Sequence, residues 1–551
     1  MDHWMVSTKY APSHAPFVGK GRWTMQIPAL KNDTLMKHVI DRGLAFQEDI
    51  KNSGNAQQTG NDRTPQLLWT NFKEDVVKIT KKHSSESRGK LTKKMRDLEK
   101  DIKNLATNPE FDTNNRIRAN ETFLAKELET LKCIEARDRK DDLRAVITNH
   151  SEVLGGVWSA MNKDRKPRDL LYRLRVPDSP NNAPRFERDT RRMAMLARDY
   201  HKSLQKTDDN PDEALEWDRR AENVLNEVKE NQRLTEQDIN NTEWLITYAQ
   251  VWKALNLMKT GTATGLDGCP YELWKELDRR YEESKYSGKK GFDIVDMLTI
   301  VFNNIQIFGM DEGLHFAEGW MCPIYKKKDP TEISNYRPIT LLNTDYKLLT
   351  KTLALQLVEP IHKMIHPDQA GFIPKRSIFN HIRLASTIIN YAEVMEVDGA
   401  IVTLDQEKAY DKIRHDYLWK CMEAFNLLEI FINTVKSLYM NAFTQVAING
   451  VMSTPFQVTR GVRQGDPLSC LLFDLAIEPL ACMMRNSEDL SIPGVEGRVI
   501  VNLFADDTTV YLSSGDRFDH LENILSKWCK ASGAKFNIEK TEIIPIGTEP
   551  H

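Results

Sequence analysis

A short acidic turn between two apolar runs constrains the fold of this chain more than any other feature. Residues 499–504 are mostly apolar, Asp506 and Asp507 follow, and residues 508–512 are again apolar or β-branched. This pattern predicts a β-hairpin with two adjacent carboxylates at its tip. Like charges this close destabilise one another unless a cation or a proton lies between them. The alternative, an ordinary solvated turn, is less favoured because a second acidic strand end lies upstream.

That second strand end is a mostly β-branched run, residues 400–404, which leads directly into Asp405 and is followed by a helical pattern at residues 415–425. Two strands that each deliver an Asp to one point form an oxygen-rich site. Such a site suits Mg²⁺, which takes one or two carboxylates together with substrate phosphates. Two such ions roughly 3.5–4 Å apart would hold the attacking and leaving oxygens of a phosphoryl transfer. The pattern therefore predicts a nucleotidyl-transfer site.

Three segments, residues 402–411, 461–469 and 504–507, resemble the successive palm motifs of reverse transcriptases. The residues of these motifs are similar to those of non-long-terminal-repeat (LINE-type) retrotransposons, notably fungal ones. The resemblance implies an α+β fold with right-hand fingers and palm around an antiparallel sheet, behind a mainly helical extension. It also implies an RNA-directed DNA polymerase that uses an RNA template, a DNA primer, dNTPs and two Mg²⁺ ions, with Mn²⁺ as an alternative.

The same resemblance assigns roles to the acidic residues. It implies that Asp405 and Asp506 ligate both metal ions and that Asp507 is a less directly coordinated neighbour. Lys540 follows in a further motif and is the candidate proton donor to the departing pyrophosphate, a general-acid role that a positioned lysine can fill. The alternative, that Lys540 is a solvated surface lysine, is equally open.

Residues 320–325 and 335–341 are two strands that bear cations and are expected to form a fingers hairpin over the incoming triphosphate. Four further residues are expected to bind the nucleotide. Arg337 offers a planar fork for the triphosphate, and one lysine of Lys326–Lys328, with Lys326 preferred, acts beside it as a point charge. Tyr410 is implied to occupy the space that a ribose 2′-hydroxyl needs, which would select deoxynucleotides. Gln464 lies in a glycine-punctuated loop, where its amide can contact the nascent base pair and dNTP.

The remaining chain is less informative. Residues 1–30 are expected to be the C-terminal remnant of an apurinic-like endonuclease, because Asp2-His3 matches the end of its Ser-Asp-His motif. Residues 31–245 form the helical extension, in which two short apolar seams, at 91–105 and 124–134, predict an antiparallel helical hairpin. Residues 246–551 are the fingers and palm. The thumb is expected to be absent or incomplete, as in a truncated element copy.

Composition adds weaker constraints. The formal net charge of −3 gives no global support for binding a polyanion. Seven scattered cysteines without a CxxC pair indicate a reducing, intracellular setting, and the resemblance implies the nucleus. No apolar run of about 18 residues occurs, so no membrane span is expected. Two alternatives stay open: a polymerase that makes RNA, which Tyr410 argues against, and a catalytically inert nucleic-acid-binding remnant.

Overall fold

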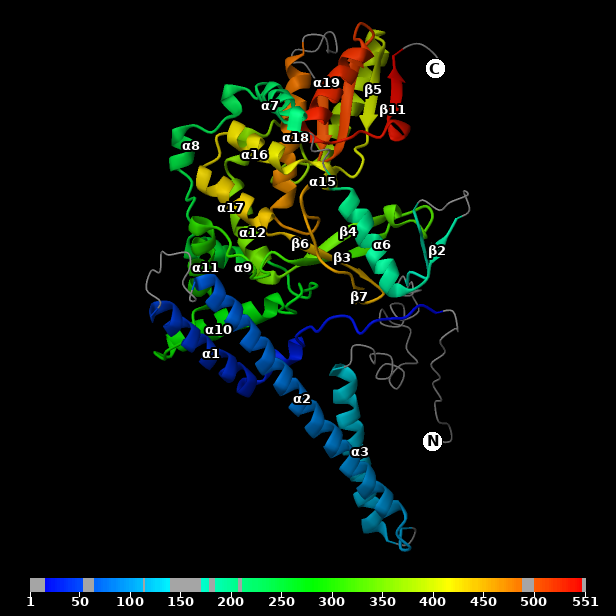
Figure 1. Ribbon diagram of the computed structural model, residues 1–551. Coiled ribbons are helices and arrows are strands. Elements are labelled where there is room, and N and C mark those ends of the chain that lie inside the picture. Colours follow the sequence, from blue (N-terminus) through cyan, green and yellow to red (C-terminus); the bar gives the residue numbers. More distant parts are fainter. Residues whose placement is uncertain are drawn as a thin grey trace. The chain divides into compact units, whose positions relative to one another are not determined.

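The computed structural model describes residues 15–52, 64–111, 114–138, 170–177, 184–206, 211–487 and 500–547 (Figure 1). The Asp2-His3 motif lies outside these residues, and the segment boundaries expected at residues 30 and 245 stay predictions. The chain divides into two compact units. The larger comprises Met1–Trp23, Gln47–Thr70 and Leu171–His551, and the smaller comprises Thr24–Phe46 and Asn71–Leu170.

In the smaller unit, the later part of α2 (Pro65–Ala106) and α3 (Asn115–Asp138) form a helical hairpin (Figure 1). The seam residues of α2 are less exposed than their polar neighbours, and Leu98 is the buried one. Two ion pairs also join the helices, Lys94 to Glu127 at 2.8 Å and Lys132 to Glu99 at 3.0 Å. The predicted helical hairpin is confirmed. Helix α1 (Asp33–Asn52) precedes it in the chain.

The palm is built on a four-stranded antiparallel sheet in the order β11-β5-β10-β9. The strands are β5 (Gly399–Leu404), β9 (Val501–Phe504), β10 (Asp507–Ser513) and β11 (Glu542–Ile546). Their β-branched residues favour extended backbone. Those of β5, β9 and β10 are mostly buried, whereas Ile543 and Ile544 of the edge strand β11 are exposed. The hairpin predicted around the acidic turn is therefore confirmed as β9 and β10, and β5 pairs with it as expected.

Helices cover this sheet. Ile388 and Ala392 of α14 (Ile378–Met395) pack with Ile401 and Tyr511 of the strands in one buried cluster. Helix α18 (Ser469–Asn486) is apolar nearly all round and is buried along most of its length, as such helices are. It packs against β9, α7 (Pro211–Leu225), α16 (His415–Ala424) and α19 (Phe518–Ser532).

The fingers contain a second sheet in which β3 and β4 form an antiparallel hairpin and β6 runs parallel to β3. Its strands are β3 (Gly319–Tyr325), β4 (Tyr336–Leu342), β6 (Phe443–Ile448), β7 (Val451–Met452) and β8 (Phe456–Gln457). Helix α6 (Thr190–Ser203) packs on β6 and β7, beside this sheet in Figure 1. The predicted fingers hairpin is confirmed.

A helical group completes the fingers, in which the buried helix α12 (Thr344–Leu357) packs on α9 (Tyr248–Leu257). Trp69 and Trp274 lie in its core and donate hydrogen bonds to Asp345 and Thr344, at 2.8 Å and 2.7 Å. The neighbouring helices are α10 (Tyr271–Tyr286), α11 (Ile294–Phe308) and α17 (Glu429–Met440).

Short elements connect these parts: β1 (Leu174–Arg175), β2 (Phe186–Glu187), α8 (Glu236–Asn240), α13 (Ile361–Met364), α15 (Ala409–Lys412), and the 3₁₀ turns η1 (Ile27–Lys31), η3 (Glu230–Gln232), η4 (Ile333–Asn335) and η5 (Ile538–Lys540). Within the described ranges, no helix combines the length and apolar character needed to cross a bilayer. The predicted α+β architecture, fingers and palm around an antiparallel sheet, is what the structure shows.

Candidate active site

The two predicted metal-binding carboxylates lie at the same end of the palm sheet. Asp405 directly follows β5, and Asp506 lies in the turn between β9 and β10. Because Thr508 pairs with Leu404, the turn is held beside the end of β5. Both residues line one cavity of about 600 Å³. Asp507 begins β10 with an exposed side chain and is not among the cavity-lining residues.

The electrostatics of this carboxylate pair favour a bound cation. Burial raises the pKa of Asp506, and the negative charges of Asp507 and Asp405 raise that pKa further. A cation would relieve this repulsion. Two lysines oppose this negative charge: Lys326 lowers the pKa of Asp506, and the Nζ of Lys540 lies 2.6 Å from Oδ2 of Asp405.

The carboxylates of the site suit a hard divalent ion that takes its remaining ligands from water and substrate. Among the described residues, no group of three or more His, Cys, Asp or Glu side chains is placed to hold a metal. Asp405 and Asp506 lie at neighbouring strand ends of the palm, whereas Glu407, which also lines the cavity with Asp411, is paired with Lys412 and Lys535. Mg²⁺ is commonly bound by one or two carboxylates together with water and substrate phosphates, so two protein ligands suffice.

The fingers hairpin brings positive charge to the same cavity. Lys326 follows β3, and Arg337 lies on β4 opposite Ile324, with its side chain exposed. Lys327 and Lys328 line the cavity as well, so all three candidate lysines lie there with Arg337. Cations on one wall and carboxylates on another suit a polyanionic ligand held through a metal ion.

Tyr410 lies on α15 with its ring stacked on Phe473, at a centroid distance of 4.8 Å and an interplanar angle of 10°. This stacking fixes the ring at the cavity wall. Burial is the main reason that the pKa of Tyr410 is raised, so its hydroxyl stays protonated.

The glycine-punctuated loop that carries Gln464 is tied to both neighbouring motifs. The N–H of Thr340 in β4 donates to the Gln464 carbonyl at 2.9 Å, and the N–H of Val462 donates to the Tyr410 carbonyl at 2.7 Å. Gly461 has a φ of 76°, and a Cβ there would overlap the Tyr410 carbonyl oxygen. The predicted need for glycine at a close backbone approach is met here.

The structure thus brings together most of the residues selected from the sequence. Those that line the cavity are Lys326, Arg337, Asp405, Tyr410, Gln464, Asp506 and Lys540. Their chemical roles stay predictions, as does the ligand role of Asp507.

Sequence reasoning did not select Lys408, which lines the same cavity. Its Nζ donates to the carbonyl of Ser334 at 2.6 Å and lies 5.9 Å from the ring centroid of Tyr200. The residue also has a left-handed φ of 51°, uncommon for a side chain of this size. Its position between Asp405 and Tyr410 in the motif was the available signal.

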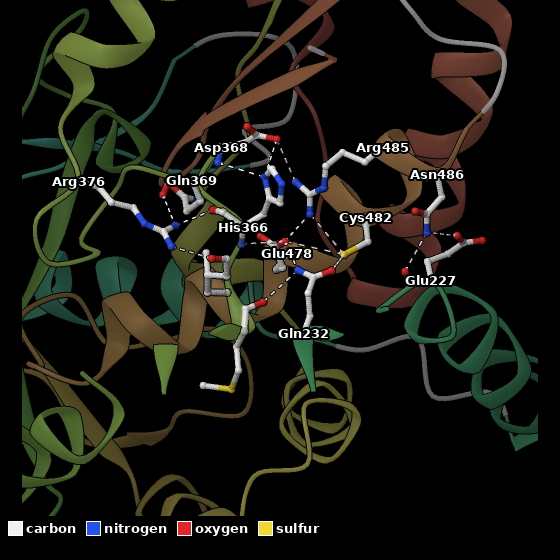
Figure 2. A network of polar contacts seen from close by, with 12 residues as sticks. Glu227, Gln232, His366, Asp368, Gln369, Arg376, Glu478, Cys482, Arg485 and Asn486 are labelled. Carbon is white, nitrogen blue, oxygen red and sulfur yellow. Dashed lines mark hydrogen bonds and ion pairs between the residues drawn. The ribbon is translucent and has the colours of Figure 1, made fainter. Parts of the chain in front are cut away.

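A polar network around Arg376 and Glu478 includes Gln369, which contacts Ala505 next to Asp506 (Figure 2). Arg376 donates to three backbone carbonyls, those of Ile365 at 2.7 Å, His366 at 2.5 Å and Gln369 at 2.8 Å. Glu478, almost fully buried on α18, accepts from Gln232 at 2.9 Å and pairs with Arg485. These contacts fix the segment that precedes α14.

A palm with paired carboxylates, faced by a cationic fingers hairpin, defines a right-hand polymerase. Comparison with known proteins agrees: the family model described as reverse transcriptase (RNA-dependent DNA polymerase) matches residues 325–547. Residues 325–547 therefore carry a reverse transcriptase domain. The names of the relatives described next support its assignment to the non-long-terminal-repeat, LINE-type class. Its expected fungal origin stays a prediction.

Three curated relatives are proteins of transposons or other mobile elements. The transposon TX1 uncharacterized 149 kDa protein of Xenopus laevis is 31% identical over 313 residues, which cover 56% of this chain and 23% of that protein. The Pol polyprotein of an R2 element of Popillia japonica is 28% identical over 224 residues, covering 40% and 31%. The RNA-directed DNA polymerase of the mobile element jockey of Drosophila melanogaster is 24% identical over 263 residues, covering 45% and 27%.

The chain thus spans less than a third of the length of each of these relatives. Among solved structures, a telomerase from Candida tropicalis with a fragment of telomeric RNA is 12% identical, with a TM-score of 0.33. That match covers 50% of this chain and 45% of the telomerase chain.

Proposed function

We propose that this chain is an RNA-directed DNA polymerase, which joins a dNTP to the 3′-hydroxyl of a DNA primer on an RNA template. The observation that carries the proposal is one cavity that contains Asp405 and Asp506 on the palm and Lys326 and Arg337 on the fingers. The names of the matched family and relatives support the same reaction.

Asp405 and Asp506 would hold two Mg²⁺ ions, or Mn²⁺ in their place, with Asp507 as a neighbouring negative charge. When bound, such ions activate the primer hydroxyl and neutralise charge on the phosphates. The carboxylates themselves orient the reacting groups, because both are fixed at strand ends of one paired sheet.

The other cavity residues act on the nucleotide directly. Arg337 binds the triphosphate through its planar fork, and Lys326 adds a mobile point charge. Tyr410, stacked on Phe473, blocks the space of a ribose 2′-hydroxyl. Gln464 contacts the nascent base pair and dNTP, and Lys540 donates a proton to the leaving pyrophosphate. An intracellular, nuclear setting with RNA and DNA as partners belongs to this proposal.

Primer extension on an RNA template with dNTPs and Mg²⁺ tests the function, beside an Asp506→Ala/Asp507→Ala double variant. We expect extension that the double variant abolishes. Extension that persists in the double variant overturns the site. An inactive wild-type chain that still binds an RNA–DNA hybrid in a salt-dependent way is the inert binding remnant instead. Equal use of rNTPs indicates a polymerase that makes RNA.

A further inference from the structure

The acidic turn contains an unusual backbone conformation. Ala505, directly before Asp506, has a left-handed φ of 58° and is buried. Two-residue hairpin turns that need positive φ favour Gly, Asn or Asp. The methyl side chain of Ala does not stabilise a positive φ. The conformation therefore persists only if surrounding groups impose it.

Gln369 is the group that contacts both backbone polar atoms of Ala505. Its Oε1 accepts the N–H of Ala505 at 2.9 Å, and its Nε2 donates to the Ala505 carbonyl at 3.4 Å. The same Oε1 accepts the N–H of Gly371 at 2.8 Å. A neutral carboxamide offers an acceptor and a donor side by side and therefore matches both groups of one peptide residue. Only 1% of Gln369 is exposed, so water does not compete for these bonds.

The backbone around Gln369 fixes it beside the hairpin. The N–H of Leu503 in β9 donates to the Asp368 carbonyl at 2.8 Å, and the N–H of Ala370 donates to the Leu503 carbonyl at 2.9 Å. These bonds form a parallel bridge along the outer edge of β9. Arg376 in turn holds the Gln369 carbonyl at 2.8 Å, as Figure 2 shows.

Gly371 makes the close approach of the two segments possible. A Cβ at this position would overlap the backbone nitrogen of Ala505. The Gln369–Gly371 segment is therefore packed directly against the turn, with no space for either to shift alone.

We propose that Gln369 is a positioning residue for catalysis: its amide imposes the left-handed turn at Ala505 and so sets where the Asp506 carboxylate lies in the cavity. This inference rests on the proposed function. Gln369 does not touch the substrate in this account and acts only through Ala505. Its loss should therefore lower the rate of the chemical step and weaken the response to Mg²⁺, while nucleotide binding by the fingers stays unchanged.

The test uses the full chain with Gln369→Ala and the near-isosteric Gln369→Glu, which keeps an acceptor and removes the donor. Gln356→Ala and Gln356→Glu are matched controls, because Gln356 is also buried and donates to backbone carbonyls, those of Glu243 and Trp244, in the fingers. Hydrogen exchange is followed on the peptide that covers residues 503–508. Single-turnover incorporation is measured with dTTP on a poly(rA)/oligo(dT) substrate over a range of Mg²⁺ concentrations.

We expect exchange in residues 503–508 to be about tenfold faster in Gln369→Ala and unchanged in the Gln356 variants. We also expect kcat to fall about 10- to 100-fold, with the KM for dTTP within about threefold of wild type. Gln369→Glu should lie between Gln369→Ala and wild type on both measurements.

Unchanged exchange in both Gln369 variants would overturn the inference, as would faster exchange with a wild-type kcat. A fall in kcat that the Gln356 variants share would reduce Gln369 to a structural role. If the wild-type chain extends no primer, the proposed function fails, whereas the exchange difference still decides whether Gln369 holds the turn.

Discussion

The Nζ of Lys540 lies 2.6 Å from Oδ2 of Asp405, so the proposed proton donor is paired with a proposed metal ligand. Both side chains keep substantial exposure, 43% for Lys540 and 36% for Asp405. An ion pair this exposed stabilises by at most about 1 kcal/mol. It can therefore open when Asp405 takes a cation and Lys540 turns to the pyrophosphate.

Lys540→Met should separate these two roles. Removing the ammonium frees Asp405, so the Mg²⁺ concentration at half-maximal rate should fall by about two- to fivefold. Loss of the proton donor should lower kcat by about 10²-fold at saturating Mg²⁺. A Mg²⁺ titration of single-turnover incorporation measures both. A variant with the wild-type kcat would show that Lys540 is only a surface lysine.

Lys408→Met should weaken dNTP binding. The Lys408 ammonium joins the palm to the segment before β4 through the Ser334 carbonyl, and β4 carries Arg337. Without that bond the KM for dNTP should rise about tenfold with kcat little changed, and Lys408→Arg should restore part of the loss. Steady-state kinetics with one dNTP checks this. Lys436→Met is the control, because Lys436 pairs with Glu423 on the surface, outside the cavity lining. An unchanged KM would contradict the prediction.

Tyr410→Ala should reduce discrimination against ribonucleotides. The ring is fixed by stacking on Phe473, and its removal opens the space for a 2′-hydroxyl. The ratio of kcat/KM for dNTP over rNTP should fall at least about tenfold. Tyr410→Phe, which keeps the ring, should retain the wild-type ratio. Competition between dTTP and UTP on one template measures the ratio, and equal ratios for the two variants would show that Tyr410 is plain core.

Two histidines that are buried in their neutral forms should each lower the stability of the fold in mild acid, whereas Asp411, whose pKa burial raises to about 6, acts in the opposite direction. Burial lowers the pKa of His201 to about 3 and that of His415 to about 4. In the unfolded chain both return to about 6.5. The unfolded state therefore binds more protons below pH 6.5, so this stability is present above that pH and is lost as pH falls toward 4. Each histidine should cost about 1.4 kcal/mol of unfolding free energy at pH 5.5.

Urea denaturation at pH 7.5 and 5.5 measures this loss. Replacing His201 with Gln should reduce the difference between the two pH values by about 1.4 kcal/mol, whatever its effect at pH 7.5. If the difference is the same in the variant and wild type, His201 does not contribute to the acid sensitivity.

The sequence predicted the strands that end near Asp405 and Asp506 because β-branched residues and acidic strand ends are local patterns. It predicted the fingers hairpin from two short strands that bear cations, which is also a local pattern. The glycines of the Gln464 loop also carried a local signal, since close backbone approaches select glycine.

What the sequence did not reveal are contacts between distant segments. Gln369 and Ala505 are 136 positions apart, and Lys408 and Ser334 are 74 apart. No periodicity or spacing links such residues, and only the folded chain brings them together. The exposure of Asp507 has a simpler cause: neighbouring residues at a strand end point to opposite sides, so adjacent aspartates do not share one cavity equally.

The central claim is that the cavity between Asp405 and Asp506 is the catalytic site. Its most direct test is the single-turnover rate of dNTP addition to an RNA-templated primer by Asp506→Asn, which keeps the shape and removes the charge. Asp519→Asn is the control, since Asp519 is exposed on α19 and pairs with Arg517. We predict a loss of about 10³-fold or more for Asp506→Asn and none for the control. A rate for Asp506→Asn within about twofold of wild type would contradict the account, because loss of a metal ligand should lower the rate far more than that.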